Sequence, residues 1–140
     1  VSFFTDRIIL TPLYRDVQAI NNIMIEKFAN AGTIIETMYS KDSVTGKYGD
    51  EEIANEYSAS CFPEHKLKIF VGCPVMILRK YSGQVNNGDR AVIDSIGLYR
   101  LGLRMLSGSR IGQIVHLPRM IYKPTKGSMR LEMHRLQFGI

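Results

Sequence analysis

Apolar residues in the first third of the chain predict a strand followed by a helix. Residues 7–10 read Arg-Ile-Ile-Leu, a short apolar run typical of a strand buried on both faces of a parallel sheet. Apolar residues then recur at the three- and four-residue spacing of a helix face, at Val17, Ile20, Met24 and Phe28. Thr11-Pro12 supplies an N-cap and a proline for the first helical turn, and Gly32 closes the helix. We therefore expect half of a βαβ unit.

The next segment, residues 45–63, is polar, acidic and rich in turn formers. It predicts a connector with one short helix around Glu51 to Tyr57.

A strand pattern of period two follows the connector, with Leu67, Ile69 and Val71 alternating with Lys66, Lys68 and Phe70. We expect one packed and one solvated face, and an end to this strand at Gly72 and Pro74. A second apolar run covers residues 75–78. Asn87-Gly88 then predicts a two-residue hairpin turn, because both central positions of a type I′ turn need positive φ.

The alternation continues to the end of the chain, in the runs 100–105, 111–117 and 130–134. Turn signals separate these runs at Gly97, Ser107-Gly108-Ser109 and Lys126-Gly127-Ser128. Short strands spaced about ten residues apart are typical of a small barrel or sandwich. Periodicity alone leaves open whether such a barrel is OB-like or SH3-like.

Composition adds little, since 140 residues with 45% apolar and 22% charged residues describe one ordinary domain or two small ones. The charge distribution adds more. Residues 1–60 hold five Lys/Arg against nine Asp/Glu, whereas residues 61–140 hold thirteen against four, so the two parts carry −4 and +9. A basic β-rich part is the electrostatic footprint of a protein that binds a phosphate backbone, the alternative being an ordinary solvated surface.

The two cysteines, Cys61 and Cys73, have neither redox nor zinc-finger spacing, which favours a reducing compartment. A metal cluster of Cys61, His65 and Cys73 lacks the fourth ligand of a structural zinc site. The longest apolar run, residues 69–78, is too short to span a bilayer and contains a glycine and a proline, so we expect no membrane partner.

Several segments in order resemble Pif-type DNA helicases, especially those of Helitron transposons. The segment HKLKIFVGCPVMILRK with NNGDRAVI, residues 65–93, resembles the portion that enters that family's SH3-like barrel. RIILTP with DVQAIN resembles the fourth helicase motif, and ETMYSKDSV resembles the strand after its helix. MLSGSRIGQIVHLPRM resembles the barrel hairpin, and RLQFGI resembles the strand that returns to the motor.

The resemblance implies an α/β fold, part of a second RecA-like motor domain, with an inserted small SH3-like β-barrel. It places the partial RecA-like domain at residues 1–64, the barrel at 65–136 and the return strand at 137–140. A chain that opens on Val1 is then expected to be a segment of a longer helicase, with the other motor domains of the same polypeptide as partners and the nucleus as its compartment, the mitochondrion being the alternative.

ATP and Mg²⁺ are the cofactors that the resemblance implies for the full-length helicase. Such a motor holds nucleotide in a glycine-rich loop that ends in Lys-Ser/Thr, and this sequence contains no Gly-Lys-Ser/Thr. We therefore expect no cofactor and no catalytic residue within these 140 residues, and an isolated chain that neither hydrolyses ATP nor unwinds DNA.

Candidate residues for binding single-stranded DNA come from positions that match the family or carry suitable charge. They are Thr11, His65, Lys66, Lys68, Arg79, Arg90, Arg110 and Arg119. Helix capping is the alternative for Thr11, a structural histidine for His65, and a solvated strand face for the lysines.

The sequence also departs from the family pattern at several positions. Leu13-Tyr14 replaces Thr-Asn, although Tyr14 offers a stacking face to a base. Asp89 beside Arg90 is expected to pair with that arginine and weaken a phosphate contact. Lys80 and Gly139 replace an asparagine and a proline. These departures leave open a second function, a non-catalytic SH3-like module that binds nucleic acid or protein.

Overall fold

The computed structural model describes residues 2–45, 51–59, 62–124 and 132–140. Within these ranges a 3-10 helix, Ser2–Phe4, precedes two α-helices, α1 (Tyr14–Asn30) and α2 (Glu51–Glu56). The strands are β1 (Glu36–Tyr39), β2 (Lys41–Thr45), β3 (Lys66–Ile69), β4 (Pro74–Met76), β5 (Arg90–Ile96), β6 (Arg100–Met105), β7 (Ile114–Pro118), β8 (Met120–Tyr122) and β9 (Glu132–Gln137). None of the helices in the described ranges has the length and apolar character needed to cross a membrane.

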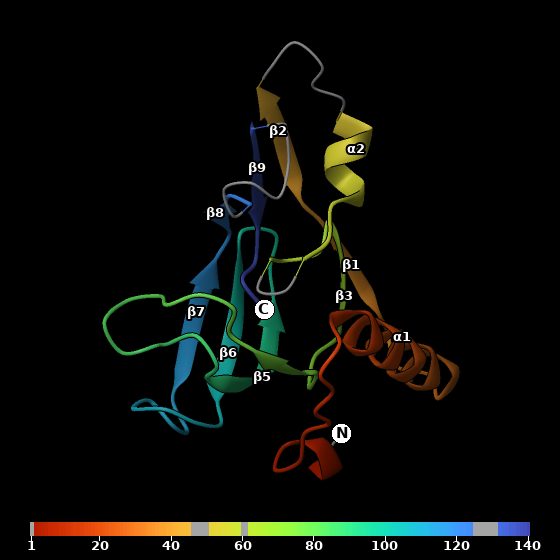
Figure 1. Ribbon diagram of the computed structural model, residues 1–140. Coiled ribbons are helices and arrows are strands. Elements are labelled where there is room, and N and C mark those ends of the chain that lie inside the picture. The colour runs from red at the N-terminus through yellow and green to blue at the C-terminus, as the bar shows by residue number, and fades with distance from the viewer. Residues whose placement is uncertain (1, 46–50, 60–61, 125–131) are drawn as a thin grey trace.

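The strands form three antiparallel sheets, with orders β1-β3, β2-β9-β8 and β4-β5-β6-β7 (Figure 1). The chain is therefore a mixed α/β protein built on antiparallel sheets. No pairing among the described residues closes these sheets into a barrel, so the SH3-like barrel stays a prediction.

The predicted strand at residues 7–10 is wrong. These residues adopt no strand, and Ile8, Ile9 and Leu10 are 57%, 57% and 84% exposed. A strand buried on both faces needs hydrogen-bonded neighbours, and every described strand already pairs with another part of this chain. The apolar run therefore lies uncovered beside α1.

Helix α1 confirms the predicted helix but not its predicted start. Leu13 is the N-cap residue and makes no side-chain capping bond, while its carbonyl accepts the first hydrogen bonds from the helix. The helix therefore begins after Thr11-Pro12. At the other end, Gly32 has φ +86 and closes the helix as expected.

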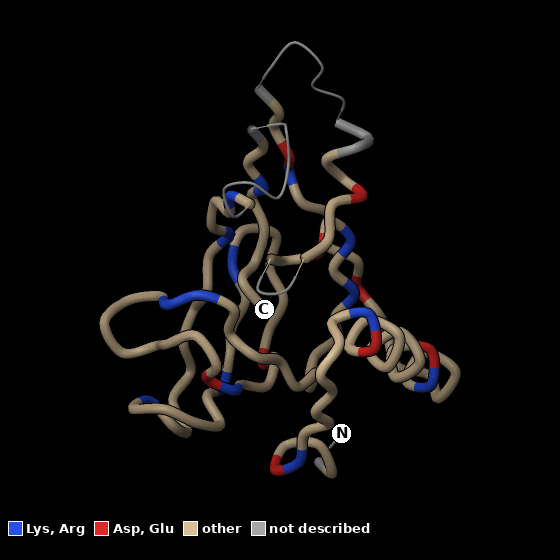
Figure 2. Tube along the Cα trace, in the orientation of Figure 1, with Lys and Arg blue, Asp and Glu red and all other residues tan. Residues whose placement is uncertain are grey.

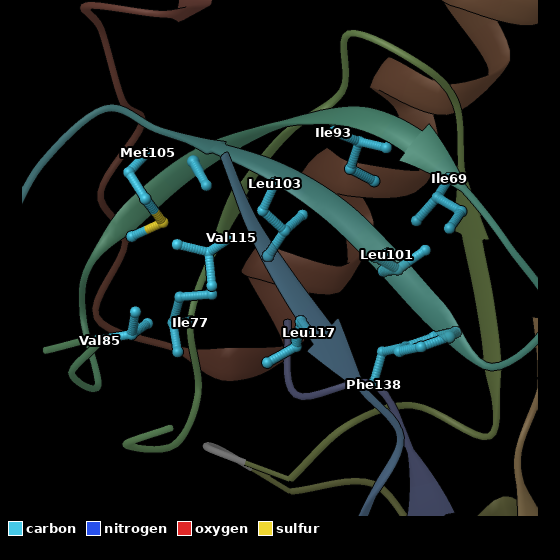
Figure 3. Packing of buried hydrophobic residues seen from close by; sticks show 11 residues of the cluster. Ile69, Ile77, Val85, Ile93, Leu101, Leu103, Met105, Val115, Leu117 and Phe138 are labelled. Carbon is cyan, nitrogen blue, oxygen red and sulfur yellow. The ribbon is translucent and has the colours of Figure 1, made fainter. Parts of the chain in front are cut away.

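The main hydrophobic core lies against the four-stranded sheet (Figure 3). The alternation of β6 buries Leu101, Leu103 and Met105 as predicted, each at most 1% exposed. Val115 and Leu117 of β7 and Phe138 after β9 pack against them, as do residues from β3 to β5. The short helix predicted in the connector is also confirmed as α2.

Three local predictions fail for identifiable reasons. ETMYSKDSV is not one strand, because the chain changes sheets at Ser40 between β1 and β2. Strand β3 ends at Ile69, so Phe70 turns inward and Val71 is 60% exposed. Asn87-Gly88 is no type I′ hairpin, because Gly88 has positive φ and Asn87 does not.

The turn predicted at residues 126–128 and the apolar Leu131 lie outside the described residues. The hydrogen bond from the Asp89 N–H to the Asn86 carbonyl closes a turn around Gly88 instead of the predicted two-residue hairpin. Strands β4 and β5 are joined by a longer loop, residues 77–89.

A buried ion pair joins the three-stranded sheet to the connector. The Arg135 side chain is 0% exposed, and its Nε and Nη2 donate to both oxygens of Asp42, which is 1% exposed, at 2.7–3.1 Å. Nη1 donates to the carbonyls of Tyr57 and Pro63 at 2.9 and 3.0 Å, and Nη2 donates to that of Ala54 at 2.6 Å. This one guanidinium therefore links β9, β2, α2 and the segment before β3.

A second, smaller cluster packs around Phe62, Tyr122 and Met133. The Tyr122 hydroxyl is buried, has no hydrogen-bond partner among the described residues, and abuts Gly139, where an added Cβ would lie 1.8 Å from the oxygen. Burial also raises the pKa of Tyr122 to about 12. A side chain at position 139 would therefore force the Tyr122 side chain to shift.

We predict that Asp42→Asn lowers the free energy of unfolding by about 3–5 kcal/mol, because it leaves the Arg135 charge buried without its counter-charge. Urea denaturation followed by circular dichroism measures the loss. The matched control is Asp94→Asn, which breaks the more exposed pair with Arg104 and should cost about 0–1 kcal/mol. Equal losses in the two variants would contradict this account of the ion pair.

We further predict that Gly139→Ala destabilises the chain by about 1–3 kcal/mol through overpacking against the Tyr122 hydroxyl. Tyr122→Phe alone should cost little, because the oxygen it removes has no partner among the described residues. Combining the two substitutions should recover part of the loss, since the clashing oxygen is gone. Strictly additive losses in the double variant would rule out the contact as the cause.

Candidate nucleic-acid interface

The ribbon of β1 and β3 presents one polar and one apolar face. Its register places Tyr39 opposite Lys66 and Thr37 opposite Lys68, and these four side chains are exposed. Met38 and Leu67, the alternate pair, pack against the main core. The period-two pattern of β3 thus sets its two lysines beside a tyrosine of the neighbouring strand.

Tyr39 is the point at which several candidate residues meet. Its side chain is 55% exposed, and Lys66 Nζ lies 5.6 Å from the ring centroid. The His65 ring meets the Tyr39 ring edge to face at 5.7 Å between centroids. Arg119 Nη1 donates to the Tyr39 carbonyl at 2.6 Å. The structure therefore gathers His65 and Lys66 around an aromatic ring and places Arg119 at the backbone of the same residue, with Lys68 further along the strand.

Arg119 holds this arrangement in place. Besides Tyr39, its guanidinium donates to the Leu98 carbonyl at 3.2 Å and lies 4.8 Å from the Phe138 ring centroid. Partial burial lowers the pKa of Arg119. The arginine links the end of β1 to the β5–β6 turn and to the core.

His65 is anchored from behind the ribbon. Its Nδ1 lies 2.8 Å from Ser40 Oγ and 3.9 Å from Asp42 Oδ2, and the Ser40 hydroxyl also donates to Asp42. These residues are not arranged as a nucleophilic triad, because serine and aspartate contact the same ring nitrogen. The histidine instead connects the ribbon to the buried Asp42–Arg135 pair.

Thr11 and Tyr14 serve the start of α1. Thr11 Oγ1 donates to Asp16 Oδ2 at 3.3 Å, and the Tyr14 hydroxyl donates to the Glu64 carboxylate. Gln18 donates to the same Glu64 oxygen at 2.8 Å. Burial, together with the bond to Glu64, raises the pKa of Tyr14 to about 12. Glu64 thus ties the helix to the segment before β3.

The remaining candidates lie away from the ribbon. Arg79 Nη1 donates to the Ile121 carbonyl at 2.9 Å, and Arg110 Nε donates to Gln84 Oε1 at 2.6 Å. Arg90 Nη2 donates to the Thr5 carbonyl at 2.6 Å. Figure 2 shows lysines and arginines spread over several separate segments of the chain. The structure therefore does not bring all the predicted residues into one groove.

The expected pairing of Asp89 with Arg90 is wrong. Asp89 Oδ2 accepts a hydrogen bond from the Asn86 N–H at 2.8 Å, which stabilises the turn, while Arg90 bonds the N-terminal segment.

Within the described ranges, no three His, Cys, Asp or Glu side chains are grouped so as to hold a metal ion. Of the two cysteines considered as ligands, Cys61 lies outside these ranges. Burial raises the pKa of the Cys73 thiol to about 11.

Sequence reasoning missed Tyr39, Arg135 and Gln137. Gln137 is fully buried, and its Nε2 donates to the carbonyl of Met38 at 2.9 Å and to that of His65 at 3.3 Å. Arg135 and Gln137 could have been found from the alternation of this strand. They share the core-facing side with Met133, and a polar residue at a buried position needs hydrogen-bond partners.

The fold is similar to portions of several solved helicase structures. A Pif1 helicase from Candida albicans matches 96% of this chain with a TM-score of 0.61 at 12% identity, and the match covers 36% of that chain. A structure of two coordinating Pif1 helicases that unwind forked double-stranded DNA matches 84% of this chain with a TM-score of 0.55 at 20% identity, and the match covers 25% of that chain. Bacteroides Pif1 bound to single-stranded DNA matches 84% of this chain with a TM-score of 0.52 at 18% identity, and the match covers 27% of that chain.

Because the sequence identities are 12–20%, the similarity shows a shared fold and no more. This chain has the fold of a portion of the Pif1 helicases, which confirms the resemblance noted in the sequence. It spans about a quarter to a third of the length of the helicases it matches. No protein-family model and no curated protein matches the sequence.

Proposed function

We propose that this chain is a segment of a Pif1-type ATP-dependent DNA helicase, and that it contributes contacts to single-stranded DNA through the β1–β3 ribbon. The observation that carries the proposal is the exposed Tyr39 ring, which is flanked by Lys66 and His65 and whose backbone carbonyl accepts a hydrogen bond from Arg119. The shared fold with Pif1 helicases supports it, one of them bound to single-stranded DNA.

The chemistry of the ribbon suits a single strand. Bases stack on exposed aromatic rings without regard to sequence, while nearby cations neutralise phosphates. A ring held in one position loses little conformational entropy when a base stacks on it. In this proposal Tyr39 stacks a base, and Lys66 and Lys68 contact the backbone on either side.

The architecture implied by the sequence resemblance belongs to the same proposal. In it the segment from residue 65 to 136 is an SH3-like insert, and residues 1–64 are part of a second RecA-like domain. The exposed Ile8, Ile9 and Leu10 would then pair with a sheet supplied by the motor domains of the same polypeptide. ATP and Mg²⁺ would bind there, outside these residues.

A non-catalytic binding module remains the second candidate. The observation that favours it is that the β-rich part has its own hydrophobic core, contributed by strands of this chain. The coding sequence on either side discriminates between the two. A phosphate-loop motif upstream and a Lys-Ser-Gln-Gly-type motif downstream support the motor, and unrelated domains or stop codons support the module.

We predict that Tyr39→Ala weakens binding of a fluorescein-labelled oligo-dT by roughly 5- to 150-fold, the equivalent of about 1–3 kcal/mol for one lost stacking contact. Fluorescence anisotropy at low salt measures the dissociation constant. Tyr39→Phe should bind like the original chain, because it keeps the ring.

The matched control is Tyr99→Ala, which removes a tyrosine that is 78% exposed at the β5–β6 turn. Equal affinities for the Tyr39→Ala and Tyr99→Ala variants would refute the proposed stacking site, and absence of binding by the original chain at low salt would refute DNA binding itself.

We also predict that the isolated chain hydrolyses no ATP above background, with or without single-stranded DNA, because its sequence contains no Gly-Lys-Ser/Thr loop. A coupled assay of ADP release checks this. Turnover stimulated by DNA would show that the nucleotide site lies within these residues after all.

A further inference from the structure

Two adjoining hollows share Ile121, a residue of the β2-β9-β8 sheet. One, of about 640 Å³, is lined by Leu78, Arg79, Ile121, Tyr122 and Lys123. The other, of about 200 Å³, is lined by Lys41, Ser43, Ile121, His134 and Leu136. The two hollows together define what we call the outer basic face.

Strand register explains why these residues share a face. Lys41 pairs with Leu136, Ser43 with His134, and Ile121 with Leu136, so their side chains project together from the sheet. The alternate residues Asp42 and Arg135 point to the opposite side and are buried there, while the buried Tyr122 borders the first hollow beside Arg79. The outer basic face is therefore set by the same alternation that buries the ion pair.

The charged side chains that the structure describes on this face are cations. Lys41, Lys123 and Arg79 are exposed cations, with His134 and Ser43 between them. Among the described side chains of the three strands, the carboxylate is that of Asp42, which lies on the opposite side and is already paired with Arg135. Arg79 is held in position by its bond to the Ile121 carbonyl and lies 5.7 Å from the Tyr122 ring centroid.

The same face also exposes apolar surface. Ile121 is 56% exposed, and Leu136 is partly exposed beside it. Cations around an apolar centre complement a single nucleic-acid strand, whose phosphates need positive charge and whose bases and sugars need apolar contact. The positive charge of the described side chains favours a polyanion over a neutral peptide.

The outer basic face begins close to Tyr39. Lys41 follows Tyr39 by two residues, so their Cα atoms are at most about 7 Å apart. This is close to the spacing of successive phosphates along a strand. A strand stacked on Tyr39 can therefore reach Lys41 without leaving the protein surface.

We propose that the outer basic face is a second contact surface for single-stranded nucleic acid, on which a strand passes from the Tyr39 ribbon over Lys41 and Ile121 to Arg79 and Lys123. This inference rests on the proposed function, because it extends the strand beyond the ribbon. The two surfaces together form one binding path, and the second surface is engaged only when the oligonucleotide is long enough to span both.

The test compares two oligo-dT lengths, about 6 and about 20 nucleotides, which bracket the usual footprint of a small single-strand-binding domain. The whole 140-residue chain is used, with Lys41→Gln and Lys123→Gln combined. The matched control combines Arg15→Gln and Lys27→Gln, which remove two exposed cations from α1. Circular dichroism and urea midpoints verify that each variant folds.

We expect the Lys41→Gln/Lys123→Gln variant to bind the long oligonucleotide more weakly and with a shallower salt dependence. The slope of log K against log salt should fall by about 0.7 for each lost phosphate contact. Its affinity for the short oligonucleotide should stay within about twofold of the original, and the α1 control should change neither.

An unchanged slope on the long oligonucleotide, in a chain whose binding depends on Tyr39, would overturn this inference and leave the proposed function standing. If binding is unchanged by Tyr39→Ala but weakened by the Lys41→Gln/Lys123→Gln variant, the proposed stacking site on the ribbon is refuted and the outer basic face is supported. Loss of binding to an oligo-glutamate peptide, with DNA binding unchanged, would assign the face to acidic protein partners and refute the inference.

Discussion

The Arg135 guanidinium fixes the relative positions of the parts from which both candidate surfaces are built. It is buried, and it bonds Asp42 of β2 and four carbonyls from α2 and the connector. A buried charge is tolerated only when its donors are satisfied, so the connector can follow few paths around it. Asp42 in turn contacts Ser40 and His65, and the His65 ring packs edge to face against the Tyr39 ring. The buried Asp42–Arg135 pair thus helps to position the β1–β3 ribbon through His65 and Ser40.

Strand β9 carries side chains that contact both candidate surfaces. Arg135 and Gln137 project to the same side, where Gln137 bonds the Met38 and His65 carbonyls and holds the ribbon against β9. The residues between and before them, Leu136 and His134, project to the other side and form part of the outer basic face. One strand therefore positions the ribbon with its inward side chains and the second surface with its outward ones. This shared support is what makes a continuous path for a strand physically reasonable.

Sequence patterns correctly predicted the elements that are specified by the local spacing of their apolar residues. The spacing of α1 and the alternation of β6 are local properties, and both elements formed as expected. The failures involve information from elsewhere in the chain. The run at residues 7–10 found no pairing partner among the described strands, and Ser40 separates two strands because their partners, β3 and β9, lie in different sheets. Tyr39 became the centre of the candidate site only because β3 places Lys66 opposite it, which no local pattern records.

The long sequence separation of the central ion pair has a consequence for synthesis. Asp42 and Arg135 are 93 residues apart, and Gln137 bonds Met38 over 99 residues. Contacts of this range form late, because a long loop must close before they contribute. A nascent chain therefore carries Asp42 without its counter-charge until Arg135 has been translated. Strand β2 cannot complete its pairing before β9 is synthesised, whereas β1 can already pair with β3.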